Sequence, residues 1–246
     1  MELGILCVGV YTNLIKNLNI LITGTSSGIG LKLAKIFLKN GNKVWGCSRK
    51  NKKISHKNYF HSKVDLANIT MTVKWASKVQ KESQNKIDIF ISNAAQFNRS
   101  LNSLEKFNSI ESSIKVNLTT PIILSNIVSK LMLQNRFGII IFFSSVAVEL
   151  KHIGSSVYSA TKSGLEIFSE TINKELKQFN IKVATFRILY SPTKLSNQLS
   201  KKEIKNLLTS YKTNKYRNIK NIMMEIIKIY KKKGSINKNL LFDKKK

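Results

Sequence analysis

The sequence predicts an α/β fold: a doubly wound, mostly parallel sheet of six or seven strands with helices on both faces. Two observations predict it. Short apolar runs alternate with longer segments of helical period, which is the pattern of βαβ units. The run at residues 139–143 holds no polar residue, so it suits a central strand covered on both faces. The length of 246 residues fits one large domain of this kind.

The elements follow from this alternation in chain order. Apolar runs predict strands at residues 18–23, 43–47, 59–64, 87–92, 138–144 and 181–188, and a last short one at 239–242. Apolar positions at helical spacing predict helices at 29–40, 69–83, 103–133 and 157–179, and one or two at 201–232. We expect residues 1–16 to be a leader of unknown structure and residues 17–246 to form a single domain.

The chain is strongly basic, with 42 Lys+Arg against 13 Asp+Glu and a net charge of +29. Such a charge is typical of proteins that bind nucleic acid or anionic membranes. The excess, however, is 37 Lys and only 5 Arg, whereas recognition of bases and phosphates favours arginine. Lys, Asn and Ile together make up 93 residues, and all three have A/T-rich codons. We therefore expect no specific nucleic-acid partner and keep nonspecific polyanion binding as a third candidate function.

The start of the chain does not read as a signal peptide. Glu2 stands where a basic segment is needed, and the apolar stretch after it is too short to span a bilayer. No other stretch reaches about 18 uninterrupted apolar residues. We expect a cytoplasmic protein without a membrane span. Cys7, Cys47 and the three histidines show no metal-ligand spacing, so neither a metal nor a disulfide is expected.

A glycine-rich turn follows the first predicted strand. It reads Thr-Gly-Thr-Ser-Ser-Gly-Ile-Gly over residues 23–30 and leads directly into a predicted helix. Glycines let the backbone turn sharply, and the free amides and dipole of a helix N-terminus favour a pyrophosphate. The spacing is neither G-x-G-x-x-G nor that of a Walker loop. The turn predicts a Rossmann-type dinucleotide site with contacts from Gly24, Ser26, Ser27, Gly28, Ile29 and Gly30.

The end of the second predicted strand favours one dinucleotide. An NAD site needs an Asp or Glu there to accept a hydrogen bond from the ribose 2′-hydroxyl, whereas this chain has Ser48, Arg49 and Lys50. A carboxylate would repel a 2′-phosphate, and the two basic side chains attract it. NADP(H) is therefore the expected cofactor and NAD(H) the less favoured one.

Three further residues carry a resemblance. Tyr158 and Lys162 are four residues apart in a predicted helix and so share one face, and Ser145 stands thirteen residues before Tyr158. With the glycine turn, they resemble the short-chain dehydrogenase/reductase family over about residues 19–193. The resemblance implies a dinucleotide-binding catalytic domain at 17–246 and an NADP-preferring reductase of a small carbonyl compound, or dehydrogenase of the alcohol. It also implies a homodimer or homotetramer.

In such an enzyme, Tyr158 would donate a proton to the carbonyl oxygen and Ser145 would hydrogen-bond that oxygen. An unperturbed phenol has a pKa of about 10, and we expect Lys162 to lower it by roughly three units, since a cation about 4 Å away supplies about that much at a dielectric near 20. By resemblance, Lys162 also binds the nicotinamide ribose, and Asn117 holds a water that relays protons to it. The resemblance assigns further cofactor contacts to Asp65, Leu66, Asn93, Ala94 and Thr193.

The chain departs from the family in two places. Ala95 replaces the last glycine of the family's Asn-Asn-Ala-Gly, where the backbone runs beside the cofactor. The family's Pro-Gly after the sixth strand falls on Ile188 and Leu189. By resemblance, residues 190–216 would form a substrate lid, and a Lys-rich segment, 217–246, follows. Because the Pro-Gly turn shapes the nicotinamide pocket, a catalytically weak NADP(H)-binding protein is the alternative function.

Overall fold

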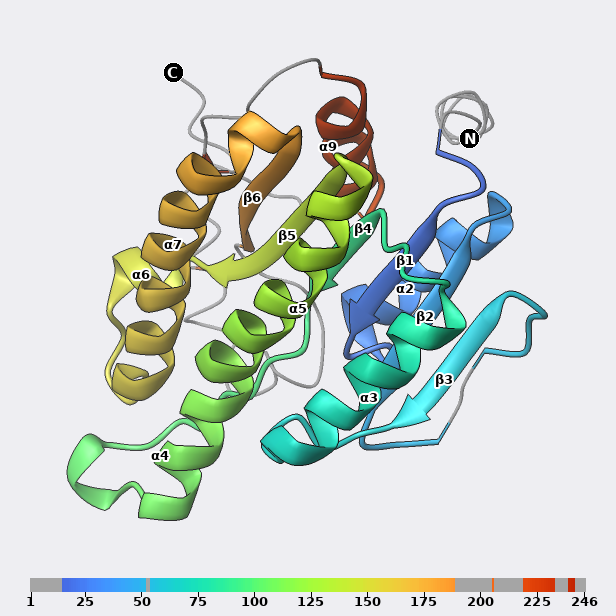
Figure 1. Ribbon diagram of the computed structural model, residues 1–246. Coiled ribbons are helices and arrows are strands. Elements are labelled where there is room, and N and C mark those ends of the chain that lie inside the picture. The colour runs from blue at the N-terminus through green and yellow to red at the C-terminus, as the bar shows by residue number, and fades with distance from the viewer. Residues whose placement is uncertain (1–14, 52–53, 189–204, 206–218, 233–238, 242–246) are drawn as a thin grey trace.

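The computed structural model describes residues 15–51, 54–188, 205, 219–232 and 239–241. Within them, seven strands form one sheet in the order β3-β2-β1-β4-β5-β6-β7 (Figure 1), and every neighbouring pair is parallel. This confirms the predicted doubly wound α/β fold. The strands are β1 (Asn19–Thr23), β2 (Lys43–Ser48), β3 (Tyr59–Lys63), β4 (Ile89–Ser92), β5 (Gly138–Ser145), β6 (Ile181–Ile188) and β7 (Asn239–Leu241).

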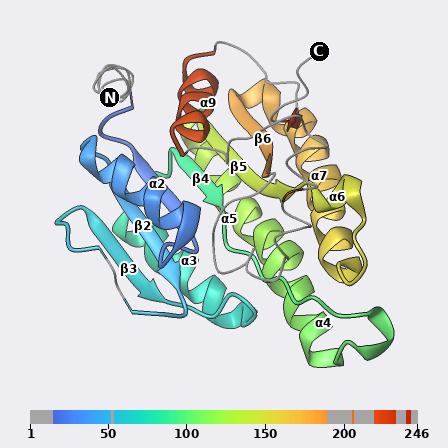
Figure 2. The ribbon, with the colours of Figure 1, turned by 180° about the vertical axis from the view of Figure 1, so that it is seen from behind.

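Helices cover both faces of the sheet. Figure 1 shows α3, α5 and α7 in front of it, and the reverse view in Figure 2 shows α2 and α9 on the other face. The α-helices are α2 (Gly28–Lys39), α3 (Ile69–Glu82), α4 (Phe107–Ile114), α5 (Thr120–Asn135), α6 (Ala147–Leu150), α7 (Ser156–Leu176) and α9 (Ile219–Lys231). Two 3₁₀ turns, η1 (Asn102–Leu104) and η3 (Lys177–Phe179), and one π turn, η2 (Lys115–Thr119), complete the described helical elements.

Each face of the sheet has its own apolar core, because side chains alternate across a strand. In β1, Ile20 and Ile22 belong to the core under α2 and α9, whereas Leu21 belongs to the core under α3, α5 and α7. The same alternation places Ile141 in the first core and Phe142 in the second. β5 lies between β4 and β6, so the run at 139–143 is buried on both faces, as predicted.

Lys182 attaches α9 to the sheet. This residue of β6 is 4% exposed, and its ammonium donates hydrogen bonds to the carbonyls of Ile229 (2.9 Å), Tyr230 (3.4 Å) and Lys232. Carbonyls at a helix C-terminus lack partners within the helix and favour a cation. Burial, with a smaller contribution from Lys232, lowers the pKa of Lys182.

The predicted helix over 103–133 is not continuous. η1 is followed by Glu105 and Lys106 in extended conformation, and the chain is then helical from α4 through η2 to α5. The π turn keeps the chain helical, so an expectation of a helix over the whole segment does not reveal it. The predicted helix over 157–179 is α-helical only as far as Leu176 and ends in η3.

The helical stretch Phe107–Asn135 has the length and composition of a membrane span. Its residues Leu124, Val128 and Leu131, however, are buried in the second core against the sheet. A core helix passes the same test of length and composition, and the packing of α5 is that of a core helix.

Candidate active site

The candidate site lies where the carboxyl ends of β1 and β4 meet. From β1 the chain continues to β2 on one side, and from β4 to β5 on the other. In open parallel sheets such a switch point opens a crevice in which ligands bind. The glycine turn follows β1, the loop at residues 93–101 follows β4, and Ser145 ends β5. The fold thus gathers the predicted glycine turn and the predicted catalytic serine at one edge of the sheet.

The glycine turn has the geometry that its residues predict. Gly24 (φ +76°) and Gly28 (φ +57°) adopt the left-handed conformation, which a side chain would disfavour. The backbone N–H groups of Gly24 and Thr25 donate to the carbonyl of Cys47 at 2.9 and 3.1 Å, which ties the turn to the end of β2. Burial raises the pKa of the Cys47 thiol to about 12, so this cysteine stays protonated at neutral pH.

The N-terminus of α2 is suited to an anion. Ser27 is its N-cap residue, yet its side chain makes no capping hydrogen bond, and the first turn holds no acidic residue. The first amides of the helix therefore lack a partner from either source, and the positive end of the helix dipole is not neutralised. Ser27 is exposed, and Ser26, Gly28 and Ile29 are half-buried. This part of the chain fits the pyrophosphate of a dinucleotide.

Asn93 joins the two loops at the switch point. Its side-chain amide donates to the carbonyls of Thr23 (2.9 Å) and Gly24 (3.2 Å), and its backbone N–H and that of Ala94 donate to Thr23 Oγ1 at 3.0 Å each. A Cβ at Gly30 would lie 2.4 Å from both Asn93 Nδ2 and the Gly24 carbonyl oxygen. Asn93, predicted as a cofactor contact, therefore holds the glycine turn, and Gly30 makes that close packing feasible.

The residues predicted for the adenosine end differ in accessibility. Arg49 and Asp65 are exposed, and the Asp65 carboxylate accepts a hydrogen bond from the Ala67 N–H at 3.0 Å. Ser48 donates its hydroxyl proton to the Lys50 carbonyl at 2.9 Å. The Leu66 side chain is buried in the second core, so its surface is taken up by packing. Arg49 and Asp65 are therefore open to a ligand.

α7 and β5 bring Tyr158, Lys162 and Ser145 together. Lys162 is 3% exposed, its Nζ lies 5.7 Å from the centre of the Tyr158 ring, and it donates to the Phe143 carbonyl at 2.8 Å. The Ser145 side chain hydrogen-bonds the Tyr158 hydroxyl. Phe97, in the loop after β4, packs on Tyr158 with the ring centres 4.9 Å apart. A phenol, an ammonium and a hydroxyl thus meet at the carboxyl end of β5, as the sequence predicts.

The pKa values of this cluster differ from the expectation. Burial raises the pKa of Tyr158 to about 12, and the hydrogen bond with Ser145 opposes the rise. Burial lowers the pKa of Lys162 to about 8, and the negative charge of Glu166 opposes the fall. The expected lowering of the Tyr158 pKa is therefore wrong for this structure. The ammonium is hydrogen-bonded to Phe143, and the desolvation of a phenolate outweighs its attraction.

Asn117 is fully buried in the π turn η2. Its Oδ1 accepts from the Gln96 N–H and its Nδ2 donates to the Gln96 carbonyl, both at 2.8 Å, and Nδ2 also lies 3.4 Å from Thr161 Oγ1. Asn117 thus joins α7 to the loop after β4. π turns inside α-helices occur frequently at functional sites. Its role in proton relay stays a prediction.

Sequence reasoning missed three residues beside the cluster: Phe97, Glu166 and Arg187. Arg187, in β6, donates to the Glu166 carboxylate of α7 through Nε (2.7 Å) and Nη2 (2.5 Å). The sequence held two signals for the Glu166–Arg187 pair. Glu166 stands four residues after Lys162, and Arg187 is a charged residue within an apolar run. Nothing in the sequence pairs Phe97 with Tyr158.

Thr193, the lid at 190–216 apart from Lys205, and residues 1–14 of the leader lie outside the described residues, as do residues 217–218, 233–238 and 242–246 of the Lys-rich segment. Of the leader, Ile15 is buried in the first core. Among the described residues, no three His, Cys, Asp or Glu side chains are grouped so that they could hold a metal ion.

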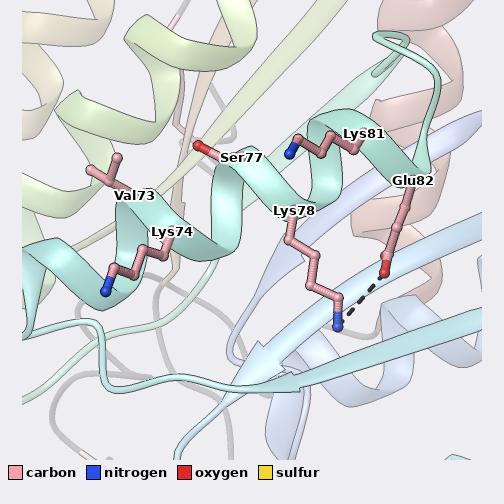
Figure 3. A pocket seen from close by; sticks show the side chains of 6 residues that line it. All are labelled: Val73, Lys74, Ser77, Lys78, Lys81 and Glu82. Carbon is pink, nitrogen blue, oxygen red and sulfur yellow. Dashed lines mark ion pairs between the residues drawn. The ribbon is translucent and has the colours of Figure 1, made fainter.

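A shallow hollow of about 490 Å³ lies on the outer side of α3 (Figure 3). Only this helix lines it, and one ion pair, Lys78 Nζ to Glu82 Oε1 at 3.6 Å, crosses it. It shares no residue with the cluster at the switch point, and its exposed side chains are those of an ordinary helix surface. Its lining residues are Val73, Lys74, Ser77, Lys78, Lys81 and Glu82.

Comparisons with known proteins agree with this geometry. A family profile described as short chain dehydrogenase matches residues 18–204. The 3-oxoacyl-(acyl-carrier-protein) reductase FabG of Chlamydia pneumoniae is 30% identical over 172 residues, which are 67% of this chain and 69% of that protein. The enzyme of the same name from Buchnera aphidicola subsp. Baizongia pistaciae is 29% identical over 210 residues, covering 82% of this chain and 84% of that protein.

Two solved structures show the same fold at lower identity. A 4-hydroxyisoleucine dehydrogenase complexed with NADH has a TM-score of 0.77 at 23% identity, covering 85% of this chain and 89% of that one. A metagenomic short-chain oxidoreductase in complex with NADP has a TM-score of 0.66 at 22% identity, covering 71% of this chain and 83% of that one.

Proposed function

Because the chain belongs to the short chain dehydrogenase family, we propose that it is an NADPH-dependent reductase that converts a carbonyl group to a secondary alcohol, with Tyr158 as the proton donor. The observation that carries the proposal is the meeting of Tyr158, Ser145 and Lys162 at the edge of the sheet where the glycine turn also lies. A cytoplasmic homodimer or homotetramer is part of the same proposal.

Each residue of the cluster has a distinct part in the proposed reaction. The bound dinucleotide supplies a hydride to the carbonyl carbon. Tyr158 donates its hydroxyl proton to the carbonyl oxygen, and Ser145 donates a hydrogen bond to that oxygen as negative charge develops on it. Lys162 places a positive charge beside the tyrosinate that remains. The glycine turn and the N-terminus of α2 would hold the pyrophosphate.

The protonation of Tyr158 favours reduction over oxidation. Its pKa of about 12 keeps the phenol protonated across the neutral range, which is the form that a proton donor needs. Alcohol oxidation would instead need tyrosinate as the base, and that form is scarce at neutral pH. This protonation state supports the proposed role of Tyr158 as the proton donor in reduction.

Two observations support the cofactor and the substrate class. Arg49 is exposed at the end of β2 and Lys50 follows it, which favours a ribose that carries a 2′-phosphate. The relatives from Chlamydia pneumoniae and Buchnera aphidicola named above are both 3-oxoacyl-(acyl-carrier-protein) reductases. We therefore propose 3-oxoacyl thioesters as the first substrates to try.

The test measures loss of NADPH absorbance with a panel of ketones and 3-oxoacyl thioesters. We expect turnover by the wild type and its loss in Tyr158→Phe. Tyr230→Phe is the matched control, because Tyr230 packs on Phe137 in the first core and lies outside the cluster. Full turnover in Tyr158→Phe would refute the role of Tyr158.

The cofactor preference is tested by binding rather than by turnover. Replacing a charge-assisted contact of about 1.5–3 kcal/mol by repulsion weakens binding about 10- to 100-fold. We expect Arg49→Glu to weaken NADPH binding by this factor, measured by fluorescence titration, and to leave NADH binding nearly unchanged. Arg136→Glu, in the turn before β5, is the matched control. Equal binding of NADPH by wild type and Arg49→Glu would refute the preference.

A second candidate function is NADP(H) binding with little catalysis. β6 continues as a strand to Ile188, where the family has the proline of its Pro-Gly turn. This candidate expects NADPH binding without turnover on any substrate of the panel, so the same two experiments separate it from the first.

A further inference from the structure

The face of α7 that packs on the sheet carries a polar stripe. Lys162, Glu166, Ser169 and Asn173 are all buried on it, although a helix packed on a sheet normally presents apolar side chains there. Lys162 contacts β5 through the Phe143 carbonyl. Farther along the stripe, Glu166 contacts β6 through a charged partner and Asn173 through a backbone N–H.

Arg187 makes two ion pairs at once. With Glu166 the contact is bidentate, through Nε at 2.7 Å and Nη2 at 2.5 Å, and the two side chains are 14% and 5% exposed. Its Nη1 lies 2.6 Å from the Glu149 carboxylate of α6, a side chain that is 32% exposed. The Arg187–Glu166 pair is therefore shielded from solvent, and the Arg187–Glu149 pair is partly screened by solvent.

Together with Lys162 on α7, the ion pairs form a row of charges whose signs alternate. Glu166 lies one turn after Lys162 on the same face, and its negative charge acts on the ammonium. Arg187 stands on the far side of Glu166 and Glu149 beyond it, so Lys162 is followed by a negative, a positive and a negative group. Among the described residues, the other group facing Lys162 from α7 is the phenol of Tyr158, and β5 contributes the uncharged Phe143 carbonyl.

Two hydroxyls mark the same space as polar. Ser144 Oγ on β5 and Thr185 Oγ1 on β6 are buried without a hydrogen-bond partner. Ser144 is the register partner of Arg187 across the two strands, and Thr185 is two residues before Arg187 on the same face. A charge in this space interacts with neighbouring charges more strongly than it would in water.

We propose that Glu166 and Arg187 are positioning residues that set the protonation state of Lys162. The negative charge of Glu166 stabilises the charged ammonium, and the positive charge of Arg187 weakens this stabilisation. The inference rests on the proposed function, in which Lys162 acts beside Tyr158. It assigns the network a role in the reaction beyond holding α7 against β6.

The direction of each effect follows from the charges. Burial lowers the pKa of Lys162 to about 8, far below that of Tyr158, so Lys162 loses its proton first as the pH rises. The fall in reduction rate at alkaline pH, which is the alkaline limb of the pH profile, therefore follows the deprotonation of Lys162. Replacing Glu166 removes its opposition to this lowering, so the limb moves to lower pH. Without Arg187, the full charge of Glu166 acts on Lys162, and the limb moves to higher pH.

The test compares pH profiles of kcat in Glu166→Gln and Arg187→Gln with the wild type. A nearby opposite charge shifts a pKa by about 1–3 units, so we expect shifts at the low end of this range, about one pH unit, downward in the first variant and upward in the second. Arg187→Lys keeps the charge and should keep the limb near its wild-type position. The pH dependence of NADPH binding, measured by fluorescence, gives a readout independent of turnover and should move in the same directions.

A purely structural role would give a different pattern. Loss of packing or of hydrogen bonds would lower kcat or the melting temperature in both variants and leave the limb in place, or move it in the same direction. Either result overturns the inference. Glu225→Gln, on α9, is the matched control for the loss of a carboxylate, and its limb should not move.

The experiment remains decisive if a single variant fails to fold. Replacing a buried ion pair by apolar residues of similar volume is often tolerated, so Glu166→Met/Arg187→Met is the substitute. Its limb should fall between those expected for the two single variants. Because Tyr158→Phe tests the proposed function separately, Tyr158-dependent turnover with limbs that do not diverge would refute this inference alone.

Discussion

Gly46, in the middle of β2, leaves room for a buried hydrogen bond above it. Thr25 Oγ1 and the Tyr59 hydroxyl lie 2.7 Å apart, and the Tyr59 hydroxyl also lies 3.0 Å from His61 Nδ1. A Cβ at position 46 would lie 2.6 Å from both Thr25 Oγ1 and the Tyr59 hydroxyl oxygen. The Gly46→Ala substitution therefore presses directly on the contact between the glycine turn and β3.

The cost of Gly46→Ala follows from three contributions. Overpacking a tight core costs about 1–3 kcal/mol. Loss of the Thr25–Tyr59 hydrogen bond adds about 1 kcal/mol. Lower entropy of the unfolded chain offsets about 0.5–1 kcal/mol. We expect a net loss of about 2 kcal/mol, which lowers the melting temperature by roughly 4–8 °C in a chain of this length.

The assay is thermal and urea unfolding of Gly46→Ala, Thr25→Ala and the double variant. Thr25→Ala removes two of the three atoms nearest to the added methyl group, so the double variant should be more stable than the sum of the single losses predicts, by about 1 kcal/mol. Additive losses would refute the steric explanation. Because Thr25 belongs to the glycine turn, Gly46→Ala should also weaken NADPH binding more than Gly41→Ala, which strains the backbone at φ +79° but whose added methyl meets no atom within 4 Å.

Three further outcomes are expected. Gly30→Ala, whose methyl would meet Asn93 at 2.4 Å, should weaken cofactor binding about 5- to 100-fold in a fluorescence titration; unchanged affinity would contradict the tight packing described. Lys182→Met should lower the free energy of unfolding by about 1.5–3 kcal/mol and speed proteolysis of α9, and equal protease resistance would show that the ammonium does not attach this helix. Burial raises the pKa of Asp88, so its protonation favours folding at low pH and this stabilisation is lost as the pH rises through the folded pKa. Asp88→Asn should therefore gain stability relative to the wild type as the pH rises above about 4, the pKa of an unperturbed Asp, and a constant difference in melting temperature would contradict this.

Most of the sheet could be predicted from the sequence because strands such as β1, β4 and β5 are apolar runs that both faces bury. The edge strand β3 is only partly apolar and partly buried. β1 and β4 end at Thr23 and Ser92, as predicted, because turn-forming residues follow both apolar runs. The break between η1 and α4 could not be predicted, because the apolar spacing is the same on both sides of Glu105.

The candidate site was predictable in part. Residues whose spacing follows from one helix, such as Tyr158 and Lys162, could be placed together from the sequence. Contacts between distant segments could not, and Asn117 with Gln96 and Glu166 with Arg187 are of that kind. The Tyr158 pKa was predicted with the wrong sign because burial of the phenol depends on the packing of Phe97, which no local pattern shows.

The wholly parallel sheet has a consequence for how the chain folds. The paired strands are joined by crossovers rather than hairpins, and the shortest stretch between register partners runs from Val44 to Tyr59. Long stretches must therefore be closed before pairing offers any gain, so we expect slow folding with unpaired edges during it. A net charge of +29 makes such partly folded chains repel one another, which opposes their aggregation.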